Sequence, residues 1–375
     1  MTFPNLESWK CSCGRHSWPK IEVIVEKGAL EKLPEVRRKL GLGGSCLIVD
    51  DVNTREVAGA SLRRSLQRDD CHVSEVVVGR PDEANVEKVV ERVGKGDFLL
   101  GVGGTSVLDI TKLAAYRASV RYVIVSTGVA NNGMSSKTAS ISIKGKKETI
   151  PVSLADALIV DLAIVSDAPT WMVAAGCGDL VAETTAIKDW QLGRDEQSEL
   201  YCNSVAELEL SALNDVIANI EMIKSRNDAG IRILVNALIR SGLGMTIWGS
   251  SRPASGSEHL WSHWLDHYAD ENKIRFGQHG EQVGIGTCLM AKYHELYDQN
   301  WWSCTQHPVY QAEALMSFLK GAGAPATPSE IGIERRLAIQ AFLDAWEYRK
   351  ERYTILHKRH PSRQDADRIL RQLSM

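Results

Sequence analysis

The first 165 or so residues alternate short β-rich runs with stretches of helical periodicity, and no other feature constrains the fold as much. Such alternation is typical of parallel βαβ units, with right-handed crossovers and helices on both faces of the sheet. It predicts strands at Ile21–Glu26, Cys46–Asp50, Val73–Val78, Phe98–Val102, Tyr122–Val125 and Ala157–Val160. It predicts helices at Ala29–Leu40, Arg55–Gln67, Glu83–Val93 and Val107–Ala118, and a hairpin of Ile141–Ile143 and Glu148–Val152 before the last strand.

Beyond about residue 168 the strand-like runs disappear. Val205–Lys224 and Gly230–Ser241 carry apolar residues at helical spacing, and Ile333–Leu373 is charged and helical in pattern. A chain of 375 residues is long enough for two cores. We therefore predict an α/β domain over residues 1–168 and an all-helical domain over residues 169–375, with the active site in the cleft between them.

Charge and composition narrow the class of partner. A net charge of -3 gives no reason to expect nucleic acid or an anionic membrane as a partner. No apolar run approaches the roughly 18 residues of a membrane span, and the N-terminus lacks the pattern of an export signal. Eight cysteines in so long a chain are not a disulfide framework, so we expect reduced thiols and a cytoplasmic protein.

One group of cysteines near the N-terminus is a candidate metal site. Cys11, Cys13 and His16 offer three ligands, but C-x-C-x2-H is not a standard zinc-finger spacing and no second pair follows nearby. The sequence favours an N-terminal turn over a separate structural metal.

Three segments follow predicted strands and are candidates for nucleotide contact. Gly101–Ser106 closes a strand and opens a helix, so it is either a turn whose backbone approaches a pyrophosphate or an ordinary tight strand–helix turn; neither standard glycine-rich fingerprint matches it. Asp51 is either a contact for the adenosine end of a dinucleotide or the N-cap of a helix. Ser126–Ser136, rich in small and amide residues, is expected to wrap a ligand at the end of a central strand.

Three stretches of the second half offer ligands for a divalent metal. Asp179 lies between glycines and apolar residues, His259 and His263 share a helical face at i, i+4, and His279 precedes a glycine. A carboxylate and two imidazoles suit zinc and leave a position open for a reacting oxygen. From spacing alone, either both histidines of the pair are ligands or one acts on substrate protons; a core histidine network is the alternative.

With these stretches in hand, the chain resembles the sn-glycerol-1-phosphate dehydrogenase family of the iron-containing alcohol dehydrogenase and dehydroquinate synthase-like superfamily. The resemblance runs from Cys11–Gly14 through Gly28–Pro34 and Gly101–Lys112 to Arg352–Leu356. Its most specific stretch is Gly249–His259, supported by residues 175–179 and 279–284.

The resemblance implies a Rossmann-like domain that binds NAD(P), a helical domain that binds one divalent metal, and the dehydroquinate synthase-like fold. The implied metal ligands are Asp179, His259 and His279, and the implied catalytic residues are Asp179 and His263, with His263 on the substrate side. Zinc is the expected ion, with nickel or iron as alternatives. Dinucleotide contacts would fall on Asp51, Gly103, Gly104, Thr105, Ser106, Val107, Thr127, Gly128, Val129, Ala130 and Ser136. His267 matches no family role and is expected on the helix surface.

The chain departs from the family in one loop. The family usually reads Pro-Thr-Ala-Ala-Ser-His-Asp-Gly, with the Asp on the substrate, where residues 126–133 here read Ser-Thr-Gly-Val-Ala-Asn-Asn-Gly. The substrate contacts would be Asn132, Asp179 and His263, and an amide in place of a carboxylate at Asn132 predicts a changed substrate.

The favoured hypothesis is an NAD(P)-dependent, metal-assisted dehydrogenase acting on a small keto-phosphate or polyol-type ketone. Dihydroxyacetone phosphate is the first substrate expected, and the protein is expected to be a homo-oligomer. The alternative is a sugar-phosphate cyclase or lyase of the dehydroquinate synthase type, which uses NAD transiently but normally has a glutamate in place of Asp179. A non-catalytic family member is the third hypothesis.

Overall fold

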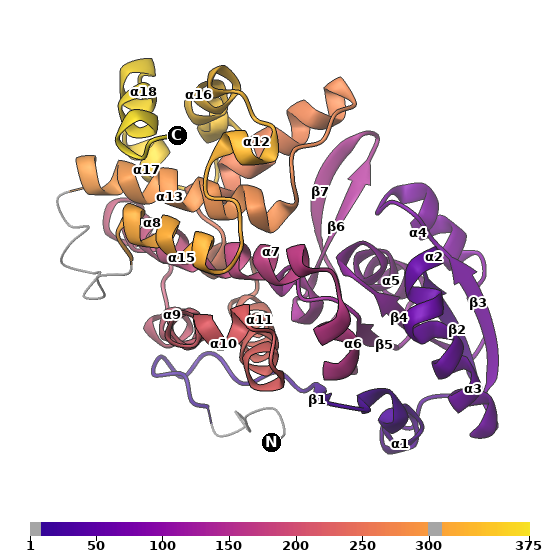
Figure 1. The fold of residues 1–375 in the computed structure, drawn as a ribbon. Coiled ribbons are helices and arrows are strands. Elements are labelled where there is room, and N and C mark those ends of the chain that lie inside the picture. Colours follow the sequence, from indigo (N-terminus) through magenta and orange to yellow (C-terminus); the bar gives the residue numbers. More distant parts are fainter. Residues whose placement is uncertain (1–8, 299–309) are drawn as a thin grey trace.

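The computed structural model describes residues 9–298 and 310–375, and every strand in them lies between Glu22 and Asp161. Figure 1 shows the sheet with its helices on one side of the molecule and the helical half on the other. The strands are β1 (Glu22–Glu26), β2 (Ser45–Asp50), β3 (His72–Val77), β4 (Asp97–Gly103), β5 (Tyr122–Ser126), β6 (Thr138–Ile143), β7 (Lys146–Pro151) and β8 (Ala157–Asp161). The strands predicted from the sequence are confirmed within a few residues at each end.

Six of these strands form one parallel sheet in the order β1-β8-β5-β4-β2-β3. Alternate residues of a strand face opposite sides, and in β2 Leu47 and Val49 join one apolar cluster while Cys46 and Ile48 join another. On the first face lie α4 (Glu83–Val90) and α5 (Thr105–Ala118); on the second lie η1 (Ala29–Lys32), α1 (Leu33–Lys39) and α3 (Ala60–Arg68). The prediction of helices on both faces is confirmed.

The strand order reverses direction at the centre of the sheet. From β2 the chain first moves outward to β3 and then returns to the other side of β2 for β4, so the crossovers diverge between β2 and β4. In open α/β sheets such a point leaves a crevice at the carboxyl ends of the strands. The segments after Asp50 and Gly103, which were singled out in the sequence, begin at this crevice.

Two predicted helices differ in detail from the structure. The stretch predicted at Arg55–Gln67 begins earlier, with α2 (Val52–Thr54), and passes through a π-helical turn, η2 (Arg55–Gly59), before α3. The wide turn passes the buried carboxylate of Asp50, and a Cβ on Gly59 would come within 2.7 Å of Asp50 Oδ2. The stretch predicted at Val205–Lys224 is interrupted at Asn219, whose backbone leaves the helical region.

The helical half is built from α7 onward, with α6 leading into it from β8. The connecting helix is α6 (Leu162–Asp167), and the first helices of this half are α7 (Thr170–Val181), α8 (Glu183–Gln197), α9 (Asn203–Ala218), the short α10 (Ile220–Lys224), α11 (Asp228–Trp248), α12 (Ser257–Asn272) and α13 (His279–Tyr297). The remaining helices are α15 (Ala312–Gly321), α16 (Arg335–Asp344), α17 (Ile355–Lys358) and α18 (Arg363–Gln372). The charged end, predicted as helical, is three short helices joined by turns.

One helix is long and apolar enough for a membrane span by composition, among the residues that the structure describes. This helix is α11, and 72% of its most apolar window is buried within the molecule. It contacts α7, α9 and α10, which is the environment of a core helix.

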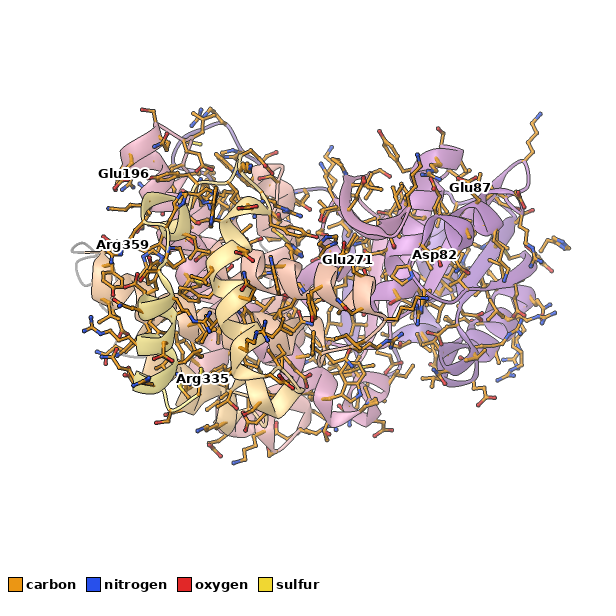
Figure 2. All side chains as sticks on the ribbon, turned by 90° about the horizontal axis from the view of Figure 1, so that it is seen from above. Asp82, Glu87, Glu196, Glu271, Arg335 and Arg359 are labelled. Atoms are coloured by element: carbon orange, nitrogen blue, oxygen red, sulfur yellow. The ribbon has the colours of Figure 1, made fainter. Side chains whose placement is uncertain are left out.

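The two halves meet along the β6–β7 hairpin and α12. The hairpin contacts α4 and α5 through β6 and α12 through β7 (Figure 1). Figure 2 shows Glu271, near the end of α12, between Asp82 and Glu87 on the α/β side and Arg335 on the helical side. The division at residue 168 stays a prediction, and residues 9–18 lie outside the sheet, packed against the helical half through Cys11 and Trp9.

Candidate metal centre and cofactor cleft

A cleft of about 1140 Å³ lies between the carboxyl edge of the sheet and the helices α7, α12 and α13. Its walls come from both halves of the chain, with Asp51 and Thr105 at one end and His259 and His279 at the other. The three predicted metal ligands and most of the predicted cofactor residues therefore line one cavity.

Asp51 fulfils one of its two predicted roles and remains free for the other. Its Oδ1 accepts from the backbone N–H groups of Asn53 (2.9 Å) and Thr54 (2.8 Å), which makes it the N-cap of α2. It also lines the cleft at the end of β2. Contact with the adenosine end of a dinucleotide stays a prediction that its position allows.

The glycine-rich turn after β4 presents only part of its residues to the cleft. Gly104, Thr105 and Ser106 line the cavity, at the first turn of α5 where backbone N–H groups lack helical partners. Gly103 and Val107 lie beneath, because a Cβ on Gly103 would come within 2.7 Å of Val107 Cβ. These two residues hold the turn close to its helix, and a direct cofactor contact from them stays a prediction.

The loop after β5 is anchored from below by a lysine that the sequence reading passed over. Thr127, Gly128, Ala130 and Ser136 line the cleft, whereas Val129 is buried against α7. The fully buried Lys112 donates to Thr138 O (3.1 Å) and Gly133 O, so α5 fixes the shape of this loop. In the sequence, only its position one helical turn after Asp109 could have drawn attention to it.

Asp179, His259 and His279 converge at the other end of the cleft. Their ligand atoms all lie within 4.8 Å of one another, and Asp179 Oδ1 stands 4.0 Å from His259 Nε2 and 3.9 Å from His279 Nε2. The three residues come from α7, α12 and α13. The predicted ligand set is thus brought together by tertiary structure across 100 residues of sequence.

A close approach of two helices explains how two of these residues meet. A Cβ on Gly178 would lie 2.2 Å from Gly280 O, and one on Gly280 would lie 2.0 Å from Ala175 O. Glycine at both positions lets the backbones of α7 and α13 touch. Asp179 and His279, each next to one of these glycines, are placed within reach of a shared ion.

Both imidazoles are oriented by hydrogen bonds to their other ring nitrogen. Glu258 Oε1 stands 2.9 Å from His259 Nδ1, and Ser262 Oγ stands 3.3 Å from His279 Nδ1. Such partners turn the opposite nitrogen toward a metal and set the ring tautomer. The sequence alone assigned no such role to Glu258 or Ser262, although Glu258 lies in the most specific stretch and Ser262 is three residues beyond its end.

The start of α12 is held by a buried carboxylate of α8. Asp189 Oδ2 accepts from the backbone N–H of Ser257 at 2.7 Å, and Asp189 Oδ1 lies 3.1 Å from His294 Nε2. Burial acts to raise the pKa of Asp189, but these hydrogen bonds keep it below its ordinary value. An ionised Asp189 thereby fixes the turn that carries His259.

The chemistry of the cluster fits a divalent cation. Asp179 is 2% exposed, and burial raises the pKa of its carboxyl, while His259 and the backbone N–H of Asn132, 3.0 Å from Oδ2, act to lower it. Burial lowers the pKa of His279 to about 3, so its ring is neutral at pH 7. A buried carboxyl group facing two imidazoles is a donor set for zinc or a similar ion.

His263 lies beside this cluster and His267 lies apart from it. The His263 ring stacks at 6.0 Å from that of His279 and at 6.1 Å from Tyr348, and burial lowers the pKa of His263 well below its ordinary value. His263 lines the cleft. His267 pairs with Glu271 Oε1 at 3.3 Å and is partly exposed, as expected for a helix-surface histidine.

Two cations that the sequence reading missed line the cleft near His263. Lys147, on β7, is paired with Asp266 Oδ2 at 2.7 Å. Arg349 is half-buried and donates to Thr149 Oγ1 at 3.0 Å. Because Lys147 already has a carboxylate partner, Arg349 is the better placed to receive an anionic group.

Comparison with known proteins places the chain among metal-dependent alcohol dehydrogenases. A family model for iron-containing alcohol dehydrogenase matches residues 24–169. The chain is 36% identical over 349 residues to glycerol-1-phosphate dehydrogenase [NAD(P)+] of Thermococcus sibiricus, covering 92% of this chain and 94% of that protein. It is 37% identical over 337 residues to the enzyme of the same name from Methanosarcina mazei, covering 89% and 90%.

Solved structures share the fold at much lower identity. Glycerol dehydrogenase from Schizosaccharomyces pombe matches with a TM-score of 0.73 and 16% identity, over 96% of this chain and 92% of its own. Maleylacetate reductase from Rhizobium sp. matches with a TM-score of 0.74 and 14% identity, over 96% and 97%. The predicted fold, a Rossmann-like half joined to a helical half, is confirmed.

Proposed function

The chain belongs to the glycerol-1-phosphate dehydrogenase family, and we propose that it is an NAD(P)-linked, metal-dependent oxidoreductase that interconverts a small keto-phosphate and its alcohol. One structural observation supports the proposal independently of the similarity to known proteins. The Asp179–His259–His279 cluster opens into the same cleft as the turns after β2, β4 and β5. A nicotinamide dinucleotide and a metal-held substrate would meet there.

Different residues of the cleft would bind the metal and the cofactor. Asp179, His259 and His279 would hold the cation, and Asp51, Thr105 and Thr127, which line the same cleft, would contact the dinucleotide. When bound, the nicotinamide supplies the hydride and the cation acts as a Lewis acid on the carbonyl oxygen.

His263 is the substrate-side residue of this proposal. Its ring is neutral at pH 7 because burial lowers its pKa, so it can accept or donate one hydrogen bond to a substrate hydroxyl. When the alcohol is oxidised, the unprotonated ring nitrogen of His263 can take the proton of the substrate hydroxyl as the hydride leaves the carbon.

Arg349 is proposed to hold the phosphate. Its guanidinium suits the oxygens of a phosphate, it lines the cleft together with His263, and its charge acts on that histidine. We further propose zinc as the ion, with nickel or iron as alternatives, and a homo-oligomer in the cytoplasm.

An absorbance assay of reduced nicotinamide tests the proposal. Purified protein with NADH or NADPH and a set of small keto-phosphates that includes dihydroxyacetone phosphate should oxidise the cofactor with at least one of them, and a chelator or His279→Ala should abolish the activity. Product formation with no net change in the cofactor would instead support the cyclase hypothesis. No turnover of any keto-phosphate by the metal-loaded protein would contradict both.

The phosphate contact is tested with a pair of substrates. Arg349→Met should raise KM for the phosphorylated ketone about tenfold or more, while turnover of unphosphorylated dihydroxyacetone should change little. Lys350→Met, which removes a neighbouring exposed cation, is the matched control. Equal effects of Arg349→Met on both ketones would exclude a phosphate contact.

A further inference from the structure

A second cluster of metal-ligand side chains lies outside the cleft, at the junction of the N-terminal segment and the helical half. Cys11, Cys13, His16 and Cys202 each offer one ligand atom, and the four atoms lie within 4.8 Å of one another. Cys11 Sγ stands 3.0 Å from Cys13 Sγ, 3.3 Å from Cys202 Sγ and 3.3 Å from His16 Nδ1. Cys13 Sγ stands 3.2 Å from His16 Nδ1 and 3.9 Å from Cys202 Sγ.

We propose that these four residues bind a structural zinc ion, separate from the ion of the cleft. Three thiolates and one imidazole form the Cys3His donor set of structural zinc sites. Two thiolates on one tetrahedral zinc stand about 3.8 Å apart, given Zn–S bonds of about 2.3 Å. The sulfur separations bracket that spacing and exceed the about 2.05 Å of a disulfide bond.

The surroundings of the cluster suit a closed, non-catalytic site. None of the four residues lines the cleft. All four ligand positions are filled by protein, so no place is left for a substrate. Cys202 is 2% exposed and Cys11 is 9% exposed, which limits exchange of the inner ligands with solvent.

The ion would fasten the N-terminal segment to the helical half. Cys202 is the N-cap residue of α9, and Ser12 reinforces the junction with its backbone N–H, which donates to Ser204 Oγ at 2.9 Å. The His16 ring stands 5.5 Å from Trp248, the last residue of α11. A metal that joins Cys13 to Cys202 closes a long loop of chain, and such closures remove much entropy from the unfolded state.

Cobalt substitution provides the test, because cobalt bound by thiolates absorbs in the near ultraviolet and cobalt bound by a carboxylate and two imidazoles lacks that band. The full-length protein, stripped with a chelator under reducing conditions and reloaded with Co²⁺, should show the thiolate band. The band should persist in His279→Ala, which disables the cleft site, and disappear in Cys202→Ser. It should also fall sharply in Cys13→Ser, which changes an exposed side chain and tests the site if Cys202→Ser fails to fold.

Zinc content gives a second, independent readout. Fully reloaded wild type should bind two equivalents of Zn²⁺ per chain, and Cys13→Ser and His279→Ala should each bind one. Cys13→Ser should also lower Tm by about 5 °C or more. Cys71→Ser, at a cysteine outside the cluster, is the matched control and should keep both equivalents.

Three results would overturn the proposal. They are a cobalt spectrum without the thiolate band in the folded wild type, a zinc content that Cys13→Ser leaves unchanged, and a disulfide among Cys11, Cys13 and Cys202 in the protein isolated from cells. Because neither readout depends on turnover, the outcome is independent of whether the proposed dehydrogenase activity is found.

Discussion

Asn132 makes two hydrogen bonds near the metal ligands, one through its backbone and one through its side-chain amide. Its backbone N–H donates to Asp179 Oδ2 at 3.0 Å, and its side-chain amide donates to Ser241 Oγ at 3.0 Å. An aspartate at this position would keep the first bond, accept from Ser241 instead, and add a negative charge beside Asp179. The residue is therefore placed to alter the charge that a substrate meets.

We predict that Asn132 marks a changed substrate preference. Dihydroxyacetone phosphate should then be a poor substrate of the wild type, and Asn132→Asp should raise kcat/KM for it about tenfold or more, equivalent to about 1.4 kcal/mol. Steady-state kinetics with reduced nicotinamide measures both values.

A control variant tests whether the gain needs a carboxylate at position 132 or only an added negative charge nearby. Asn131→Asp adds the same charge one residue away and keeps an oxygen for the cap on Gly133 N–H, so it should not reproduce the gain. Ordinary enzyme turnover of dihydroxyacetone phosphate by the wild type, with no gain from Asn132→Asp, would sink the idea.

Among the helices, the contact between α7 and α13 decides whether the metal ligands meet. The glycines Gly178 and Gly280 let the backbones touch, since a Cβ at either position would overlap backbone atoms of the facing helix. Backbone cannot move aside as a flexible side chain can. The spacing of the two helices is therefore sensitive to a single methyl group.

Gly280→Ala should separate α7 from α13 and weaken the cleft metal site. We expect about 1–3 kcal/mol of lost stability from overpacking, together with at least a tenfold weaker affinity for the cleft metal, measured by denaturant unfolding and by metal titration. Gly321→Ala, in α15, is the control, because the added Cβ would meet only Ile220 at 4.0 Å. Equal metal affinity in Gly280→Ala and wild type would contradict the role of this contact.

A buried pair of carboxyls between α8 and α9 makes stability depend on pH. Burial raises the pKa of Glu209 from 4.5 to about 8 and raises the pKa of Glu183 well above its ordinary value. The folded chain thus holds protons that the unfolded chain releases above about pH 4.5. Stability contributed by the protonated pair is present at low pH and is lost as pH rises toward 8.

Glu209→Gln should flatten this decline between pH 5 and pH 8. The amide cannot ionise, so the slope should fall by up to about 1.4 kcal/mol per pH unit, the limit for one proton. Urea unfolding at several pH values measures it. Glu207→Gln, on the exposed side of the same helix, should leave the slope unchanged; an identical slope in both variants would refute the assignment.

Over the whole molecule, the two halves share one apolar core. A single cluster of buried side chains runs from Leu99 and Ile124 in the sheet, through Val129 in the loop, to Leu180 and Leu238 in the helical half. Because the halves bury surface against each other, neither can unfold without exposing the other.

Calorimetry should therefore show one unfolding transition. Zinc and reduced nicotinamide together should raise its Tm, since ligand at a hundred times Kd adds about 2.7 kcal/mol to the folded state. His279→Ala should lose the part of the shift that is due to the cleft metal. Two resolved transitions, with only one moved by the ligands, would contradict the shared core.

The sequence predicted the sheet well and the helices less completely. Strand residues such as Leu47 and Val49 alternate with Cys46 and Ile48 over a buried surface, and that local pattern is enough to locate β2. The π-helical turn after Asp51 leaves no comparable pattern, because it depends on the packing of Gly59 against Asp50.

The sequence and the family resemblance together predict the candidate metal ligands of the cleft. They do not predict the residues that orient these ligands. Glu258 and Ser262 matter because each faces a ring nitrogen of a metal ligand, and Arg349 matters because it lines the same cleft as His279. None of these relations is local, so no periodicity in the sequence predicts them.

By itself, the sequence determined the order of strands and helices, the two-part architecture and the metal-ligand types in the second half, since these follow from local patterns of apolar and polar residues. Tertiary structure decided which distant side chains share a site. Asp179 meets His279 because two glycines let helices touch, and Cys202 joins Cys11 and Cys13 because α9 begins beside the N-terminal segment. Such proximity depends on packing between elements, which spacing along the chain does not encode.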